Sequence, residues 1–334
     1  MSAVRRAARG ALYTGGALAA IGGSLWAAEV LAARSIRRRD DPHADEILRP
    51  LALERRSVRS FDGSGINVVD VGAGRPIVLV HGVTLSVRTW VRQFEPLTAR
   101  GYRVIAVDQR GHGDSSVGDA GHAVEHLGDD LAAVVAGLDL HDVVLVGHSM
   151  GGIAVQSFAI RHPTVVRERV VGLVLLSTLC RTPVGSQSAR VRAAVERLTK
   201  RTPDTTRLWA APNLGLLLAR FGFGREPYAS EVELVRQMLR DCPNETRVNA
   251  PRALIGMDLT SELETIDTPT LIVCGTADVI TPPFHARQLH EHIRGSQLRW
   301  ADGGGHMLML ERTEWLNDTI VEFAVSVGAT VESS

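Results

Sequence analysis

The chain has 334 residues, of which 45% are hydrophobic and 22% charged, a composition typical of a globular protein with a large buried core. Basic and acidic residues number 37 each, so the net charge near zero argues against a nucleic-acid partner. The cysteines, Cys180, Cys242 and Cys274, are too widely spaced for a disulfide framework or a CxxC metal site, and we expect small buried residues.

The N-terminus carries an apolar segment, residues 11–33, whose one charged residue, Glu29, lies near its end. The segment is long enough to cross a bilayer, and the arginines on both sides leave its orientation open. Because it is rich in Ala and Gly, a cleaved signal peptide and a soluble helix packed on the domain are alternatives. We expect residues 1–40 to form a transmembrane anchor with a basic flank. The protein would then be membrane-associated, with a secreted or cytoplasmic location as the alternative.

Beyond a polar linker, residues 41–56, short apolar runs alternate with longer helical patterns. Continuous Val, Ile and Leu predict parallel strands that are covered on both faces. Strands that alternate with helices along the chain favour right-handed crossovers and an open, doubly wound sheet. The predicted strands are residues 66–72, 76–82, 102–111, 142–149, 170–178 and 269–278, and the predicted helices include residues 89–101, 124–140 and 150–163.

This alternation stops between residues 181 and 262, where helical patterns continue without a convincing strand. We interpret residues 181–262 as a helical insertion between two strands of the sheet. The α/β core is then formed by residues 57–180 and 263–334. Within the insertion, residues 208–224 carry apolar side chains that either close its own core or face a ligand.

The peptide GHSMG places Ser149 between two glycines, directly after an apolar strand and at the start of a helical pattern. Functional residues in an open α/β sheet gather at the carboxyl ends of the strands. A strand, a sharp turn and a helix are the setting of a nucleophile elbow, in which Gly147 and Gly151 avoid clashes that a Cβ would cause. We therefore predict that Ser149 is a nucleophile.

A serine hydroxyl needs a base, and the base needs an orienting acid. Most of the 12 histidines lie in helical patterns, but His306 lies in a glycine-rich loop that follows the strand pattern SQLRW. Asp278 ends the last of the predicted strands, where it is also a candidate helix N-cap. Ser149, Asp278 and His306 follow one another in the order that this sheet topology imposes, and we predict that they form a catalytic triad.

Acyl transfer also needs backbone donors for the oxyanion. We expect the N–H groups of Met150, at the start of the helix after the elbow, and of Val83, in the HGVT loop. His81 is expected to brace that loop, and His148 to pack beside the nucleophile.

The motifs HGVT, DQRGHGDS, GHSMGG, GTADVITPP and GGGHM together resemble those of serine hydrolases of the α/β-hydrolase fold superfamily, of the esterase and lipase type. The resemblance covers roughly residues 57–328 and implies an α/β-hydrolase fold: a mostly parallel, doubly wound sheet with a helical cap inserted before the acid-bearing strand. It further implies that the cap, residues 181–262, shapes the acyl or leaving-group pocket, and that Asp108 and Arg110 are structural.

The expected activity is cleavage of a small to medium, apolar carboxylic ester or a lipid-like small molecule through an acyl-enzyme. Epoxide hydrolases and haloalkane dehalogenases have an aspartate at the position of Ser149, which argues against them. The alternatives are a carbon–carbon bond hydrolase, a cofactor-free haloperoxidase or perhydrolase with the same triad, and a non-catalytic ligand-binding protein. No cofactor or metal is expected, because HExxH and Cys/His ligand spacings are missing from the sequence, and His290 and His292 lie two apart in a helical pattern and face different ways. The oligomeric state stays open.

Overall fold

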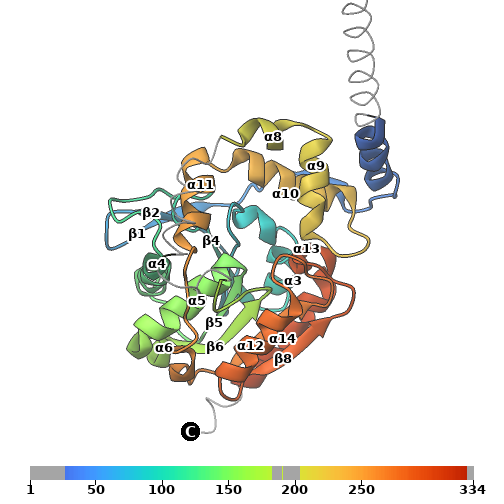
Figure 1. Cartoon of the computed structure of the whole chain (residues 1–334). Helices are drawn as coiled ribbons and strands as arrows, with labels where there is room; N and C mark the ends of the chain where they lie inside the picture. Colours follow the sequence, from blue (N-terminus) through green and yellow to red (C-terminus); the bar gives the residue numbers. More distant parts are fainter. Residues whose placement is uncertain (1–26, 183–189, 191–203, 329–334) are drawn as a thin grey trace, which may run out of the picture.

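A computed structural model describes residues 27–182, 190 and 204–328, and its centre is a single eight-stranded sheet (Figure 1). The strand order is β1-β2-β4-β3-β5-β6-β7-β8. Strands β3 to β8 run parallel, whereas β2 is antiparallel to both β1 and β4. The strands are β1 (Arg55–Arg59), β2 (Gly65–Val71), β3 (Arg75–Val80), β4 (Tyr102–Val107), β5 (Val143–His148), β6 (Val170–Leu176), β7 (Thr270–Gly275) and β8 (Gln297–Ala301). The predicted mostly parallel, doubly wound sheet is confirmed.

Helices cover both faces of this sheet, which explains why its central strands are apolar throughout. Along β3, Ile77 and Leu79 belong to one buried cluster, and Val78 and Val80 belong to another on the opposite face. The first cluster is completed by α3 (Phe94–Thr98), α13 (Leu308–Glu311) and α14 (Thr313–Gly328), and the second by α4 (Val124–Gly137), α5 (Met150–Arg161), α6 (Pro163–Arg169) and α12 (Pro283–His292). A short 3-10 helix, η1 (Val87–Trp90), precedes α3.

The chain between β6 and β7 forms helices that lie above the carboxyl ends of the strands (Figure 1). They are α8 (Thr206–Ala210), α9 (Leu214–Ala219), η2 (Arg220–Gly222), α10 (Ala229–Asp241) and α11 (Asn244–Ala253), whereas η3 (Leu263–Thr265), just before β7, contacts α5 and α12. Within the apolar residues 208–224, Leu216 and Phe223 are buried in the core cluster, whereas Leu214 and Phe221 are exposed. This stretch therefore closes a core and also presents apolar side chains outward.

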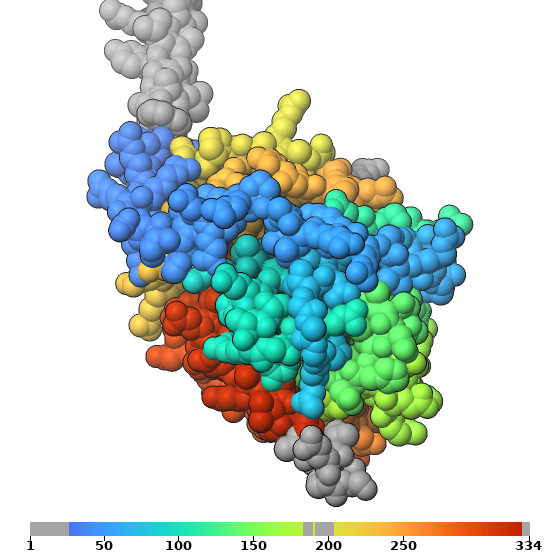
Figure 2. All heavy atoms as spheres, turned by 180° about the vertical axis from the view of Figure 1, so that it is seen from behind, coloured from blue at the N-terminus to red at the C-terminus, as the bar shows by residue number. Residues whose placement is uncertain are grey.

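The residues before β1 are folded against the insertion, although we expected residues 41–56 to be a linker. They contain α2 (Ala44–Leu48), and the side chain of Asp41 accepts a 2.8 Å hydrogen bond from the backbone N–H of Ser230 in α10. The ring of His43 packs edge-on against Tyr228, with 5.5 Å between the ring centroids. Figure 2 shows these blue N-terminal residues spread across one face of the molecule, below the yellow and orange insertion.

The predicted transmembrane segment at residues 11–33 is wrong. In the part of the chain that the structure describes, no helix is long and apolar enough to span a bilayer. Residues 11–26 lie outside the described residues, and residues 27–37 are helical, with Ala33 fully buried in the core cluster. The membrane-associated location inferred from the segment is corrected with it; among its described residues Ala33 is buried, whereas Leu31 is exposed.

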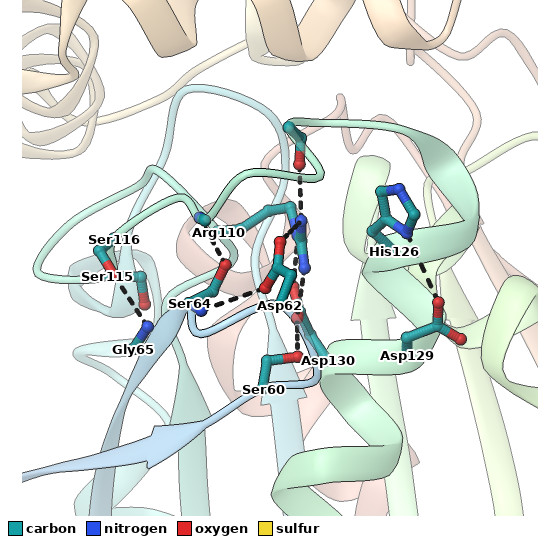
Figure 3. Close-up of polar contacts among 12 residues, drawn as sticks. Ser60, Asp62, Ser64, Gly65, Arg110, Ser115, Ser116, His126, Asp129 and Asp130 are labelled. Atoms are coloured by element: carbon teal, nitrogen blue, oxygen red, sulfur yellow. Dashed lines mark hydrogen bonds and ion pairs between the residues drawn. The ribbon is translucent and has the colours of Figure 1, made fainter.

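A buried ion-pair network ties the loop after β4 to the surrounding elements (Figure 3). The guanidinium of Arg110 is fully buried and donates two 2.7 Å hydrogen bonds to the carboxylate of Asp130 in α4. It donates a third, of 3.1 Å, to Asp62 in the turn between β1 and β2, while the hydroxyl of Ser60 donates to Asp130. The predicted structural role of Arg110 agrees with these contacts.

Replacing Asp130 by alanine leaves the buried guanidinium with half of its compensating charge. We expect Asp130→Ala to lower the free energy of unfolding by about 3–5 kcal/mol, measured by urea denaturation. The control is Asp119→Ala in the loop between β4 and α4. Its side chain is exposed, and we expect a change in the free energy of unfolding below about 0.5 kcal/mol. Equal losses for the two variants would contradict this account.

Candidate active site

Ser149 lies in the turn between β5 and α5, as the sequence predicts, and its backbone adopts φ 52° and ψ −117°. This conformation is costly for a residue with a Cβ and persists only where the surroundings hold it. The turn is tight, since a Cβ on Gly151 would lie 2.2 Å from the carbonyl oxygen of Val80, and one on Gly147 would lie 2.4 Å from that of Gly151. The side chain of Ser149 is partly exposed at the carboxyl end of β5.

The structure brings Asp278 and His306 together. Asp278 follows β7 and His306 follows β8, and the distance from His306 Nδ1 to Asp278 Oδ2 is 2.9 Å. Both residues are buried. The other carboxylate oxygen accepts 2.9 Å hydrogen bonds from the backbone N–H groups of Ile280 and Thr281, and the Thr281 hydroxyl donates to Oδ2 at 2.8 Å.

These contacts decide the charge of Asp278. Burial alone would raise the pKa of its carboxyl group, but the neighbouring His306 and the hydrogen bonds from His306 and Thr281 outweigh burial and hold the pKa below its ordinary value. Asp278 is therefore an ionised acceptor that orients the imidazole through Nδ1, which leaves Nε2 free to exchange a proton elsewhere.

His306 reaches the elbow through the residue before Ser149. The rings of His148 and His306 lie 4.6 Å apart between centroids, and His148 Nε2 lies 3.0 Å from the backbone oxygen of His306. Burial, aided by the nearby His306, lowers the pKa of His148 well below its ordinary value, so its neutral ring donates this hydrogen bond from Nε2. Within the described residues, no hydrogen bond joins the Ser149 hydroxyl to His306, and such bonds often tighten only when substrate binds.

The two expected oxyanion donors, Val83 and Met150, belong to segments that contain or adjoin Ser149 and Gly82. Met150 is the first residue of α5, and a Cβ on Gly82, next to Val83, would lie 3.1 Å from Ser149 Cβ. His81 braces this loop: its Nδ1 lies 2.7 Å from the oxygen of Gly82, and its Nε2 accepts a 3.0 Å hydrogen bond from the N–H of Gln109. Burial lowers the pKa of His81 to about 4, which keeps the ring neutral.

Three polar contacts at the site escape sequence reasoning: the Thr281 hydroxyl on Asp278, the ring of His148 on the carbonyl of His306, and the carboxylate of Glu311. Glu311 accepts hydrogen bonds from the N–H groups of Gly305 and Met307, on either side of His306. Of the three, only the contact of Thr281 leaves a signal in the sequence, because Thr281 follows Asp278 by three residues and the two can belong to one turn. Nothing in the sequence marks the other two, because their partners are backbone atoms brought close by the fold.

A cavity of about 1100 Å³ lies between the loop that precedes α4 and helix α11. Its lining includes Val124 and Met257, which form a small apolar cluster with Ile153, one helical turn after Ser149. The charged residues of the lining are Asp119, Glu125, Glu245, Asp258 and Arg252, so acidic groups predominate.

Comparison with known proteins places this geometry in a family. The model of the alpha/beta hydrolase family matches residues 77–319. A non-heme haloperoxidase of Rhodococcus erythropolis is 32% identical, over 80% of this chain and 99% of its own length. A non-heme chloroperoxidase of Kitasatospora aureofaciens is 30% identical, over 78% and 96% of the two chains.

Solved structures agree with this assignment. An esterase from Exiguobacterium antarcticum superposes with a TM-score of 0.71 at 26% identity, over 81% of this chain and 99% of its own. A thermophilic esterase from Thermogutta terrifontis gives a TM-score of 0.68 at 29% identity, over 82% and 99% of the chains. The chain therefore belongs to the alpha/beta hydrolase family.

Proposed function

We propose that the protein is a serine hydrolase that cleaves an uncharged, small to medium carboxylic ester. Ser149 is the nucleophile, His306 the general base and Asp278 the orienting acid. The observation that carries the proposal is the 2.9 Å contact between Asp278 and His306 beside a serine held at positive φ, at the carboxyl ends of three strands of one sheet.

The reaction proceeds by acyl transfer. His306 Nε2 takes the proton of the Ser149 hydroxyl as the oxygen attacks the ester carbonyl, and the N–H groups of Val83 and Met150 stabilise the oxyanion. His306 then protonates the leaving alcohol. In the second half, His306 takes a proton from water as the water oxygen attacks the acyl carbon, and it returns that proton to Ser149 Oγ as the bond to the acyl group breaks and the acid leaves.

The lining of the cavity beside α11 contains none of the three triad residues, but this cavity adjoins the elbow helix through Ile153, and its charge supports an uncharged substrate. Its lining carries more carboxylates than basic groups, so an anionic substrate would meet a repulsive potential. Ile153, Val124 and Met257 form a buried apolar cluster, and its members Val124 and Met257 also line the cavity, where they would contact an alkyl or aryl group. In this proposal residues 181–262 act as the cap that selects the substrate.

A second candidate function is supported by the names of the relatives, several of which are non-heme haloperoxidases or chloroperoxidases. The same acyl-enzyme, attacked by hydrogen peroxide in place of water, gives a peracid and free Ser149. This perhydrolase activity needs no residue beyond those already assigned.

Removal of the Ser149 hydroxyl removes the atom that attacks. We expect a fluorophosphonate probe to label the wild-type protein and to leave Ser149→Ala unlabelled, read out by gel fluorescence. The control is Ser57→Ala, an exposed position on β1, which should label like the wild type. Equal labelling of Ser149→Ala and the wild type would show that another residue is the nucleophile.

The two candidate activities can be distinguished by the product that forms when water and hydrogen peroxide compete for the acyl-enzyme. We expect the wild type to hydrolyse chromogenic esters, with a preference among acyl lengths, and His306→Ala to lose several orders of magnitude in kcat. Added hydrogen peroxide should change the product to peracid only if the site favours peroxide over water. An absence of turnover at every acyl length would contradict the esterase proposal.

A further inference from the structure

The carboxylate of Glu311, at the end of α13, is partly buried and takes no part in the mechanism above. Its two oxygens accept hydrogen bonds from three backbone N–H groups. Oε2 accepts from Gly224 at 2.6 Å and from Gly305 at 3.1 Å, and Oε1 accepts from Met307 at 3.0 Å. Charge-assisted hydrogen bonds of this kind are stronger than those between neutral groups.

The donors come from two segments that are far apart in the sequence. Gly305 and Met307 flank His306, while Gly224 belongs to residues 222–224 of the insertion, which we call the cap arm. The same arm accepts a 2.9 Å hydrogen bond from the N–H of His306 itself, through the carbonyl of Gly222. The backbone of His306 is thus bound directly to the cap arm, and Glu311 binds both partners.

The contact between the two segments leaves no room for adjustment. A Cβ on Gly305 would lie 2.2 Å from the nitrogen of Gly224, so the two backbones pass in direct contact. Phe223, between the bonded residues of the arm, is buried in the core cluster and anchors it. A displacement of the arm would therefore displace the loop that carries His306.

The charge of Glu311 depends on the same donors. Burial holds the pKa of its carboxyl group above its ordinary value, and the hydrogen bonds from Gly224, Gly305 and Met307 offset part of this rise by stabilising the ionised form. If the loop and the arm separate, the carboxylate loses donors that burial makes hard to replace. The hydrogen bonds to Glu311 therefore stabilise the arrangement in which the cap arm contacts the loop that carries His306.

We propose that Glu311 is a positioning residue for the catalytic base, and that it couples the placement of the cap arm to the orientation of the His306 imidazole. This inference rests on the proposed role of His306. It assigns the cap a second task besides shaping the pocket, namely holding the base in line with Ser149.

Glu311→Gln tests the coupling, because it keeps the size of the side chain but turns an amide N–H₂ toward backbone donors. We expect kcat for a chromogenic ester and the rate of fluorophosphonate inactivation to fall together by about 10- to 100-fold, with KM within about twofold, since a misplaced base slows acylation. Glu314→Gln, an exposed position in α14, is the matched control and should behave as the wild type.

A purely structural role predicts a different result: Glu311→Gln would lower Tm while kcat and the inactivation rate per folded molecule stay unchanged, and that outcome overturns the proposal. Should the glutamine variant fail to fold, Glu311→Asp keeps the charge but draws it back by one methylene. It should then lose part of kcat with KM unchanged, and wild-type kinetics in the aspartate variant would equally overturn the proposal.

Failure of this inference is distinguishable from failure of the proposed function. His306→Ala is measured beside Glu311→Gln with the same probe. If His306→Ala labels as fast as the wild type, the assignment of the base is wrong. If His306→Ala is slow but Glu311→Gln matches the wild type, only the coupling through Glu311 is wrong.

Discussion

The strained turn at Ser149 is the constraint on which the site depends. A φ of 52° at a residue with a Cβ costs free energy, and the neighbouring strands hold it in place. The N–H of Ser149 donates to the carbonyl of Leu176 in β6 at 3.0 Å, and its own carbonyl accepts from the hydroxyl of Thr178 at 2.6 Å. Because β5 lies between β3 and β6, both neighbouring strands contribute to the turn. The hydroxyl of Ser149 is left at the carboxyl end of β5.

The parallel sheet explains how distant residues meet at this turn. The elbow, the proposed acid and the proposed base follow β5, β7 and β8, whose carboxyl ends lie at the same end of the sheet. The sheet sets only the approximate positions, and backbone contacts refine them. Asp278 is held by the N–H groups of its own turn, while the carbonyl of His306 is held by His148 and its N–H by the cap arm. In our proposal the sheet fixes the relative positions of Ser149, Asp278 and His306, and the cap can therefore differ according to the substrate.

The sequence predicts the fold well and the fine structure of the site poorly, for physical reasons. Apolar runs such as that of β5 identify a strand buried on both faces, but β1, with the sequence RRSVR, is mostly exposed and has no such run. The roles of His148 and Glu311 depend on backbone atoms of remote segments, which leave no local pattern. The transmembrane prediction failed because an alanine-rich apolar stretch is compatible with packing against protein, as the buried side chain of Ala33 illustrates.

The measurement that tests the account most directly is a crystal structure of the protein after reaction with a small alkyl phosphonate, which mimics the tetrahedral intermediate. We predict a bond from phosphorus to Ser149 Oγ, with the phosphoryl oxygen about 2.7–3.1 Å from the backbone nitrogens of both Val83 and Met150. An adduct on another residue, or a phosphoryl oxygen bound by neither nitrogen, would contradict the proposed site.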